Sequence, residues 1–115
     1  MRRIRLARAA RSDIAGILRL SEEQFGTEGR SRYKALLDRA ILDLSEAPSR
    51  AGVQPIDSIR AGYRTYHIKW AETRVTKPTV KQPRHLMVFS TDEQGDVVIA
   101  AVVHERETLQ RHLDQ

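Results

Sequence analysis

The change in hydrophobic periodicity at Gly62 constrains the fold of this chain more than any other sequence feature. Before this residue, apolar side chains recur at helical spacing, whereas after it they alternate or form short continuous runs, as strands do. The alternation begins at once in residues 63–68, YRTYHI, which places successive side chains on opposite faces of a strand. We therefore expect helices in the first half of the chain and a sheet in the second.

Two helices are predicted in the first half. The first begins near Ser12 and Asp13, because a serine can cap the free N–H groups of a first turn and an acidic residue suits the positive end of the helix dipole. It ends at Gly26, where glycine allows the left-handed stop. The second helix ends before Pro48 and has the clearest apolar stripe in the chain, at Tyr33, Leu36, Leu37, Ala40, Ile41 and Leu44. Because the Gly26-Thr27 link is short, the two helices should form an antiparallel hairpin.

A small sheet is predicted from the remaining segments. Ile4–Leu6 suits a short strand, and three further strands are expected at residues 62–70, 86–89 and 97–103. The last of these is apolar throughout, so both of its faces should be covered, and it is the best candidate for the central strand. A hairpin turn is expected at residues 92–96, a surface loop at 48–59, and a short terminal helix at 105–113. The predicted order is β-α-α-β-β-β-α, an α+β domain in which a helical hairpin packs on one face of a mostly antiparallel sheet.

Composition limits the class of protein. A chain of 115 residues with 40% hydrophobic and 30% charged residues predicts one globular domain, 1–115. It has no cysteine, which excludes disulfides and thiolate metal sites. His67 and His85 flank a polar segment, but two histidines without a third ligand do not predict a metal site, and we expect no cofactor. No apolar run has the length of a signal peptide or a membrane span, so we expect a soluble, cytoplasmic protein.

The charge of the chain points to an acidic partner. A net charge of +5 and a pI near 10.1 favour either nucleic acid or an acidic protein segment. Aromatic residues make up only 5% of the chain, which argues against a platform for stacking single-stranded bases.

Several motifs occur in an order that resembles a known family. They are Ala9–Ile14 before the first helix, the Phe25-Gly26 helix end, Asp57–Tyr66 at the entry to the sheet, and Val98–His104 as a last strand that ends in histidine. Together they resemble the ParE branch of the RelE/ParE superfamily, the toxins of bacterial toxin–antitoxin pairs. The resemblance spans nearly the whole chain. One segment departs from it, because residues 70–84 form a much longer insertion than the short turn that is usual there.

The resemblance implies a function by binding rather than by catalysis. ParE-like toxins of type II systems bind DNA gyrase and trap it in its cleavage state, and a ParD-like antitoxin neutralises them. The C-terminal segment of such an antitoxin wraps the toxin across the helical hairpin and sheet, and an acidic segment would suit this basic chain. The candidate functional surface on this basis comprises Arg60, Tyr63, Arg64, Tyr66, His104 and Arg106. A degenerate toxin that serves only as a partner of its antitoxin is a further alternative.

The enzymatic alternative is a RelE-like endonuclease that cleaves messenger RNA on the ribosome. His104 would then serve as base or acid, and Arg64, Lys69, Arg84 and Arg106 would stabilise the phosphate charge. No tyrosine follows Tyr66, although His104 and His112 are available near the C-terminus. Direct binding of nucleic acid is expected only in this alternative. Structural roles compete with these functional ones: Arg64 could hold the loop at 48–59 through Asp57, and His104 could bond a backbone carbonyl.

Overall fold

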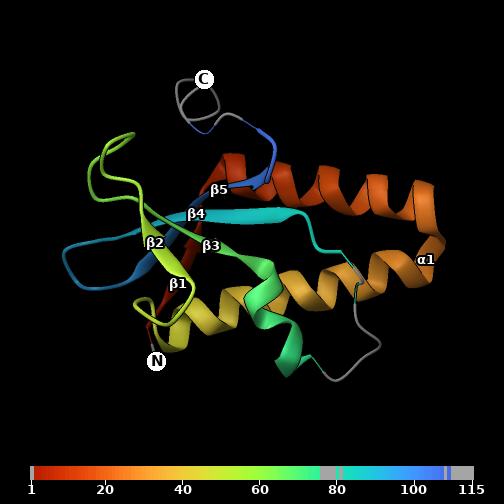
Figure 1. Cartoon of the computed structure of the whole chain (residues 1–115), viewed down its shortest axis with the longest axis horizontal. Coiled ribbons are helices and arrows are strands. Elements are labelled where there is room, and N and C mark those ends of the chain that lie inside the picture. Colours follow the sequence, from red (N-terminus) through yellow and green to blue (C-terminus); the bar gives the residue numbers. More distant parts are fainter. Residues whose placement is uncertain (1, 76–79, 81, 108, 110–115) are drawn as a thin grey trace.

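The chain folds into a helical layer on one face of a five-stranded sheet, as Figure 1 shows. The computed structural model describes residues 2–75, 80, 82–107 and 109. The elements in order are β1 (Ile4–Leu6), α1 (Arg8–Glu46), β2 (Val53–Pro55), β3 (Arg64–His67), the 3₁₀-helix η1 (Ile68–Arg74), β4 (His85–Thr91) and β5 (Val97–His104). The predicted α+β class is therefore confirmed.

Element α1 is a helical hairpin rather than one continuous rod. Gly26 has φ 77° and ψ −174°, which are not helical angles, and the two halves of α1 run in opposite directions from it (Figure 1). Only glycine adopts this positive φ readily, so the predicted turn at this residue is confirmed. The predicted start of the first helix is wrong, because α1 begins at Arg8. Among the described residues, no helix is both long enough and apolar enough to cross a bilayer.

The strands follow the order β1-β5-β4-β3-β2, with β1 parallel to β5 and the other pairs antiparallel. Strand β5 is interior, as predicted, but β4 occupies the middle position. The predicted loop at 48–59 contains the unpredicted strand β2, which ends at Pro55 on the sheet edge, where a missing N–H costs no ladder hydrogen bond. The strand predicted at 62–70 ends at His67, because the chain turns there into η1.

The insertion at 70–84 and the C-terminal segment are only partly described, whereas the turn between β4 and β5 is complete. The turn at residues 92–96 is confirmed, with the carboxylate of Asp92 accepting hydrogen bonds from the backbone N–H groups of Gln94 and Asp96. In the insertion, residues 70–74 belong to η1, and positions 76–79 and 81 lie outside the described residues. Residues 105–107 form a turn, and most of the helix predicted at 105–113 also lies outside the described residues.

Strand β5 contains a bulge that changes which side chains face the helices. Val88 of β4 pairs with Ala101, but the next residue, Phe89, pairs with Ile99, so Ala100 is an extra residue in β5. Extended strands place alternate residues on one face, and an extra residue resets this alternation. As a result Ile99 before the bulge and Val102 after it both pack in the core beneath α1.

The main core lies between α1 and the sheet. Both halves of the hairpin contribute to it, as do β3, β4 and β5, and its fully buried large side chains include Leu36, Leu37, Leu44, Tyr66, Met87, Phe89 and Ile99. Leu36, Leu37, Ala40 and Leu44 belong to the predicted apolar stripe, and all four are buried. A smaller cluster covers the opposite face of the sheet, around Val88, Ala101 and Val103.

A buried carboxylate holds the end of α1 to the sheet and to η1. Asp43 is 0% exposed, and it accepts hydrogen bonds from the hydroxyl of Tyr66 at 2.7 Å and from Nε of Arg74 at 2.9 Å. Nη2 of Arg74 makes a second contact, and Arg39 and Arg50 lie at 3.0 and 3.5 Å. Burial acts to raise the pKa of Asp43, but the hydrogen bonds from Arg74 and Tyr66 outweigh it, so the pKa falls below its usual value of 3.8. The group is therefore charged at neutral pH.

Removing this carboxylate should destabilise the protein strongly. We expect Asp43→Ala to lower the free energy of unfolding by about 3 kcal/mol, because three guanidinium groups and the Tyr66 hydroxyl would lose their shared acceptor. Chemical denaturation measures this. The matched control is Asp38→Ala on the same helix, whose side chain is 59% exposed and pairs with Lys34 at 2.7 Å. That change should cost less than about 1 kcal/mol, and equal losses for the two variants would contradict this role of Asp43.

Candidate functional site

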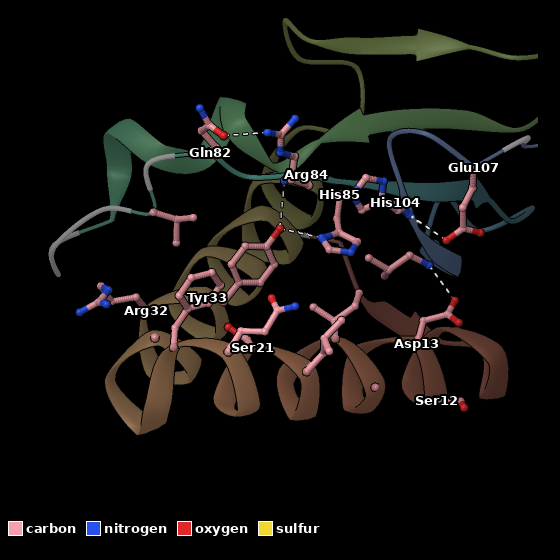
Figure 2. Close-up of a pocket in the computed structure, with 18 residues that line it drawn as sticks. Ser12, Asp13, Ser21, Arg32, Tyr33, Gln82, Arg84, His85, His104 and Glu107 are labelled. Carbon is pink, nitrogen blue, oxygen red and sulfur yellow. Dashed lines mark hydrogen bonds between the residues drawn. The ribbon is translucent and has the colours of Figure 1, made fainter.

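A groove of about 1090 Å³ lies between α1 and the adjoining ends of β4 and β5, as Figure 2 shows. Its floor and sides come from segments far apart in the sequence. The lining residues are Ser12, Asp13, Gly16, Ile17, Leu20, Ser21, Gln24, Phe25, Gly29, Arg32, Tyr33, Val80, Gln82, Arg84, His85, Val102, His104 and Glu107.

The helical side of the groove carries apolar side chains that the protein's own core does not cover. Leu20 is 52% exposed and Phe25 is 68% exposed, and both lie in the first half of α1. Ile17 lies between them and the core and is half-buried. Large exposed apolar groups that gather beside a hollow mark a surface for a partner or ligand.

The other end of the groove holds a hydrogen-bonded pair, Tyr33 and His85. The Tyr33 hydroxyl accepts from the backbone N–H of Arg84 at 3.0 Å and lies 2.6 Å from Nδ1 of His85. Which of the two atoms donates in this hydrogen bond depends on the tautomer of His85, because the hydroxyl can both donate and accept. The ring of His85 also makes edge-to-face contacts with Tyr33 at 5.5 Å and with His104 at 5.4 Å (Figure 2).

Burial sets the protonation state of this pair. It lowers the pKa of His85 to about 4, and the neighbouring His104 adds to the effect. Burial also raises the pKa of Tyr33. Both groups are therefore neutral at pH 7, and this end of the groove offers dipoles rather than full charges.

A charged cluster lies next to the pair. Glu105 accepts from Nε2 of His67 at 2.8 Å and from Nη1 of Arg84 at 3.0 Å, and these two hydrogen bonds lower its pKa to about 2. A second nitrogen of Arg84 donates to Gln82 at 2.7 Å. The guanidinium of Arg84 is thus held by neighbours on two sides.

Asp13 and Glu107 hold the backbone of β5 at the groove. Asp13 accepts from the N–H of Val102 at 3.0 Å, so it links α1 to β5 instead of starting a helix. Glu107 accepts from the N–H of His104 at 3.1 Å, and Figure 2 shows both bonds at the edge of the groove.

Comparison with known proteins identifies the family. A family model described as the ParE toxin of the type II toxin–antitoxin system parDE matches residues 4–109. The chain belongs to the ParE toxin family. The known protein Toxin ParE1 of Caulobacter vibrioides is 36% identical over 64 residues, which are 56% of this chain and 65% of that toxin. The match therefore covers a little less than two-thirds of the length of that relative.

The structure separates the six residues predicted for the functional surface of this ParE-family chain. Arg60 and Tyr63 lie together, with the guanidinium 5.3 Å from the ring centroid. Arg64 follows Tyr63 in the chain, but its guanidinium is engaged within the protein. Its Nη1 donates to the carbonyl of Pro48 at 3.1 Å and to the hydroxyl of Ser49 at 3.3 Å. It therefore holds the 48–59 loop, as one interpretation predicted, but through Pro48 rather than Asp57.

The other three predicted residues lie elsewhere. Tyr66 is fully buried against Asp43, whereas Tyr63 is half-buried, in line with the expectation that the two rings face opposite ways. His104 lies in the groove, and its Nδ1 accepts from the backbone N–H of the exposed Arg106 at 3.1 Å, whereas the structural interpretation had the ring bonded to a backbone carbonyl.

The groove depends on residues that the sequence analysis did not assign to a site. Tyr33 and His85 are 52 positions apart, so no local motif joins them. Phe25 closes the apolar stripe of the predicted first helix, and nothing in a helical stripe distinguishes a core residue from an exposed one. No group of three His, Asp or Glu side chains within the described part of the chain could hold a metal ion.

Acid should destabilise the protein through His85. The unfolded chain binds a proton at the ordinary pKa of 6.5, whereas folded His85 binds one only near pH 4. Unfolding therefore takes up a proton between these values, and the free energy of unfolding should fall by up to about 1.4 kcal/mol per pH unit as the pH drops. Chemical denaturation at several pH values above 4.5, where Asp43 and Glu105 remain charged, measures the slope. We expect His85→Gln to reduce it, and an unchanged slope would contradict the assignment.

Proposed function

We propose that this chain is the toxin of a type II toxin–antitoxin pair, that it acts by binding DNA gyrase and not by a reaction of its own, and that a ParD-like antitoxin neutralises it. The observation that carries the proposal is membership of the ParE family over residues 4–109. The target and the antitoxin are the parts that go beyond this membership.

The arrangement of the cations supports binding over catalysis. Ribonuclease chemistry needs cations that converge on one phosphate next to an acid or base. Strand pairing places His104 opposite His85 at one end of the sheet, whereas Arg64 pairs with Phe89 further along β4. Lys69 lies over the ring of Trp70, and Arg84 is bound to Glu105 and Gln82. Arg64 therefore lies away from His104, and Arg84, which lines the groove with His104, is already held by Glu105 and Gln82.

The groove is the part of the surface best suited to the antitoxin. Leu20 and Phe25 offer apolar anchors, and Arg32 and Arg84 at its rim offer charge to an acidic, amphipathic segment. Apolar contacts would supply most of the affinity, and the charges would direct the approach. A segment seated there would also cover the exposed apolar groups, which otherwise favour aggregation.

Substitution at the groove should separate antitoxin binding from folding. Because Phe25 is 68% exposed, Phe25→Glu should leave the fold intact. It should weaken the binding free energy of the cognate antitoxin by about 2 kcal/mol or more, as expected for the loss of an aromatic anchor. Titration calorimetry measures the affinity, and thermal unfolding checks the fold. Ile59→Glu is the matched control, because Ile59 is a 38% exposed apolar residue that does not line the groove. Equal effects of the two changes would argue against the groove as the seat.

The gyrase assignment is tested directly with purified enzyme. Free toxin mixed with gyrase and supercoiled DNA should cause linear, cleaved DNA to accumulate, whereas toxin without gyrase should leave the DNA intact. Arg60→Ala and Tyr63→Ala should reduce cleavage, because these two residues are the neighbouring members of the candidate surface.

The same experiment distinguishes the alternatives. If gyrase is unaffected while expression of the toxin still arrests growth, the result supports the endonuclease hypothesis. In that case His104→Ala or Arg106→Ala should abolish toxicity. If neither gyrase nor growth responds, the chain is a degenerate toxin that survives as a partner of its antitoxin.

A further inference from the structure

A second surface, which shares no lining residue with the groove, combines an exposed aromatic ring with a cluster of cations. Trp70 in η1 is 47% exposed, and Nζ of Lys69 lies 5.9 Å from the ring centroid. Arg39, Arg50 and Arg74 surround the buried Asp43 just beside it, and Nη2 of Arg74 donates to the backbone carbonyl of Trp70 at 2.9 Å. We call these residues, with Gly52, the Trp70 patch.

The backbone at Gly52 supports one side of the Trp70 ring. Gly52 has φ 98° and lies directly against the indole, where an added Cβ would come within 2.7 to 2.8 Å of three ring atoms. Only a glycine at this position lets the ring lie flat against the backbone. A rigid ring that the fold supports on one side, and that stays about half exposed, offers a stacking surface to an incoming planar group.

The arginines of the patch keep binding capacity beyond their structural role. Their charges meet one buried carboxylate, Asp43, with Glu46 at 3.4 Å from Arg39 as a second acid. Each guanidinium also retains at least one nitrogen without a hydrogen-bond partner among the residues that the structure describes. The side chains of Arg39, Arg50 and Arg74 are 24%, 23% and 33% exposed, respectively. Their remaining donors are therefore accessible to an oxyanion.

We propose that the Trp70 patch binds single-stranded nucleic acid, with an unpaired base stacked on Trp70 and the adjoining phosphates bound by Arg50 and its neighbours. The carboxylates of an acidic peptide would use the cations alone, whereas every nucleotide carries both a phosphate for the cations and a planar base for the indole. The patch shares no residue with the groove or with the candidate gyrase surface, so this proposal does not depend on gyrase or the antitoxin. Aromatic residues are few, but one supported ring among cations is sufficient for stacking.

Trp70 is the only tryptophan in the sequence, so its fluorescence reports on this patch alone. Titrating the full chain with an oligothymidylate of about 20 nucleotides should quench or shift the emission and reach saturation. This measurement uses the unmodified protein and therefore does not depend on whether a variant folds. A polyglutamate peptide of equal charge should produce no comparable change.

Variants then test the two halves of the proposed contact. Anisotropy of a labelled oligothymidylate should show that Trp70→Ala and Arg50→Gln each weaken binding by about tenfold. The control is Arg5→Gln, which removes the same charge from an exposed arginine in β1. This substitution should change the affinity by no more than about twofold, because salt screens the interaction of charges that do not contact the ligand. Equal losses for Arg5→Gln and Arg50→Gln would overturn the proposal in favour of diffuse surface charge. Saturable binding of polyglutamate at the patch, or no oligonucleotide binding at all, would also overturn it.

Discussion

The buried carboxylate of Asp43 is the interaction on which the arrangement of the layers depends. It lies near the C-terminal end of α1 and accepts hydrogen bonds from β3 through Tyr66 and from η1 through Arg74, while Arg50 brings in the chain that precedes β2. A buried charge is costly unless it is fully paired, so each of these segments must be in place for the group to be satisfied. Burial, together with the hydrogen bond to Asp43, raises the pKa of Tyr66 to about 12. One side chain thereby specifies how four segments meet.

Hydrophobic spacing was sufficient to predict the layers but not the contacts that join them. The helical stripe from Leu36 to Leu44, the stop at Gly26 and the apolar run of β5 each reflect a local rule, and the structure agrees with them. The start of α1 was misplaced because Ser12 and Asp13 look like a helix cap, whereas the carboxylate of Asp13 binds the backbone of β5 instead. A long-range hydrogen bond of this kind leaves no trace in nearby residues. The same applies to Tyr33 and His85, and it explains why the candidate site was harder to predict than the fold.

The groove and the Trp70 patch are built from different parts of α1. The groove uses the first half and the residues just after Gly26, whereas the patch gathers around Asp43 near the end of the second half. Their lining residues do not overlap, so a partner in the groove would not have to displace one at the patch. The helical hairpin thus presents one apolar and one cationic surface, and the net charge of +5 does not describe either of them by itself.

The bulge at Ala100 reverses which alternate residues of β5 face α1. Ile99 and Val102 both reach the core, and His104, two residues beyond Val102, lines the groove on the same side. Had the strand continued without the extra residue, Ala101 and Val103 would face α1, and the imidazole would point to the far side of the sheet. The composition would be unchanged, yet the groove would be lined by a methyl-bearing side chain in place of a polar ring. Insertions and deletions in this strand therefore alter the chemistry of the groove as sharply as substitutions do.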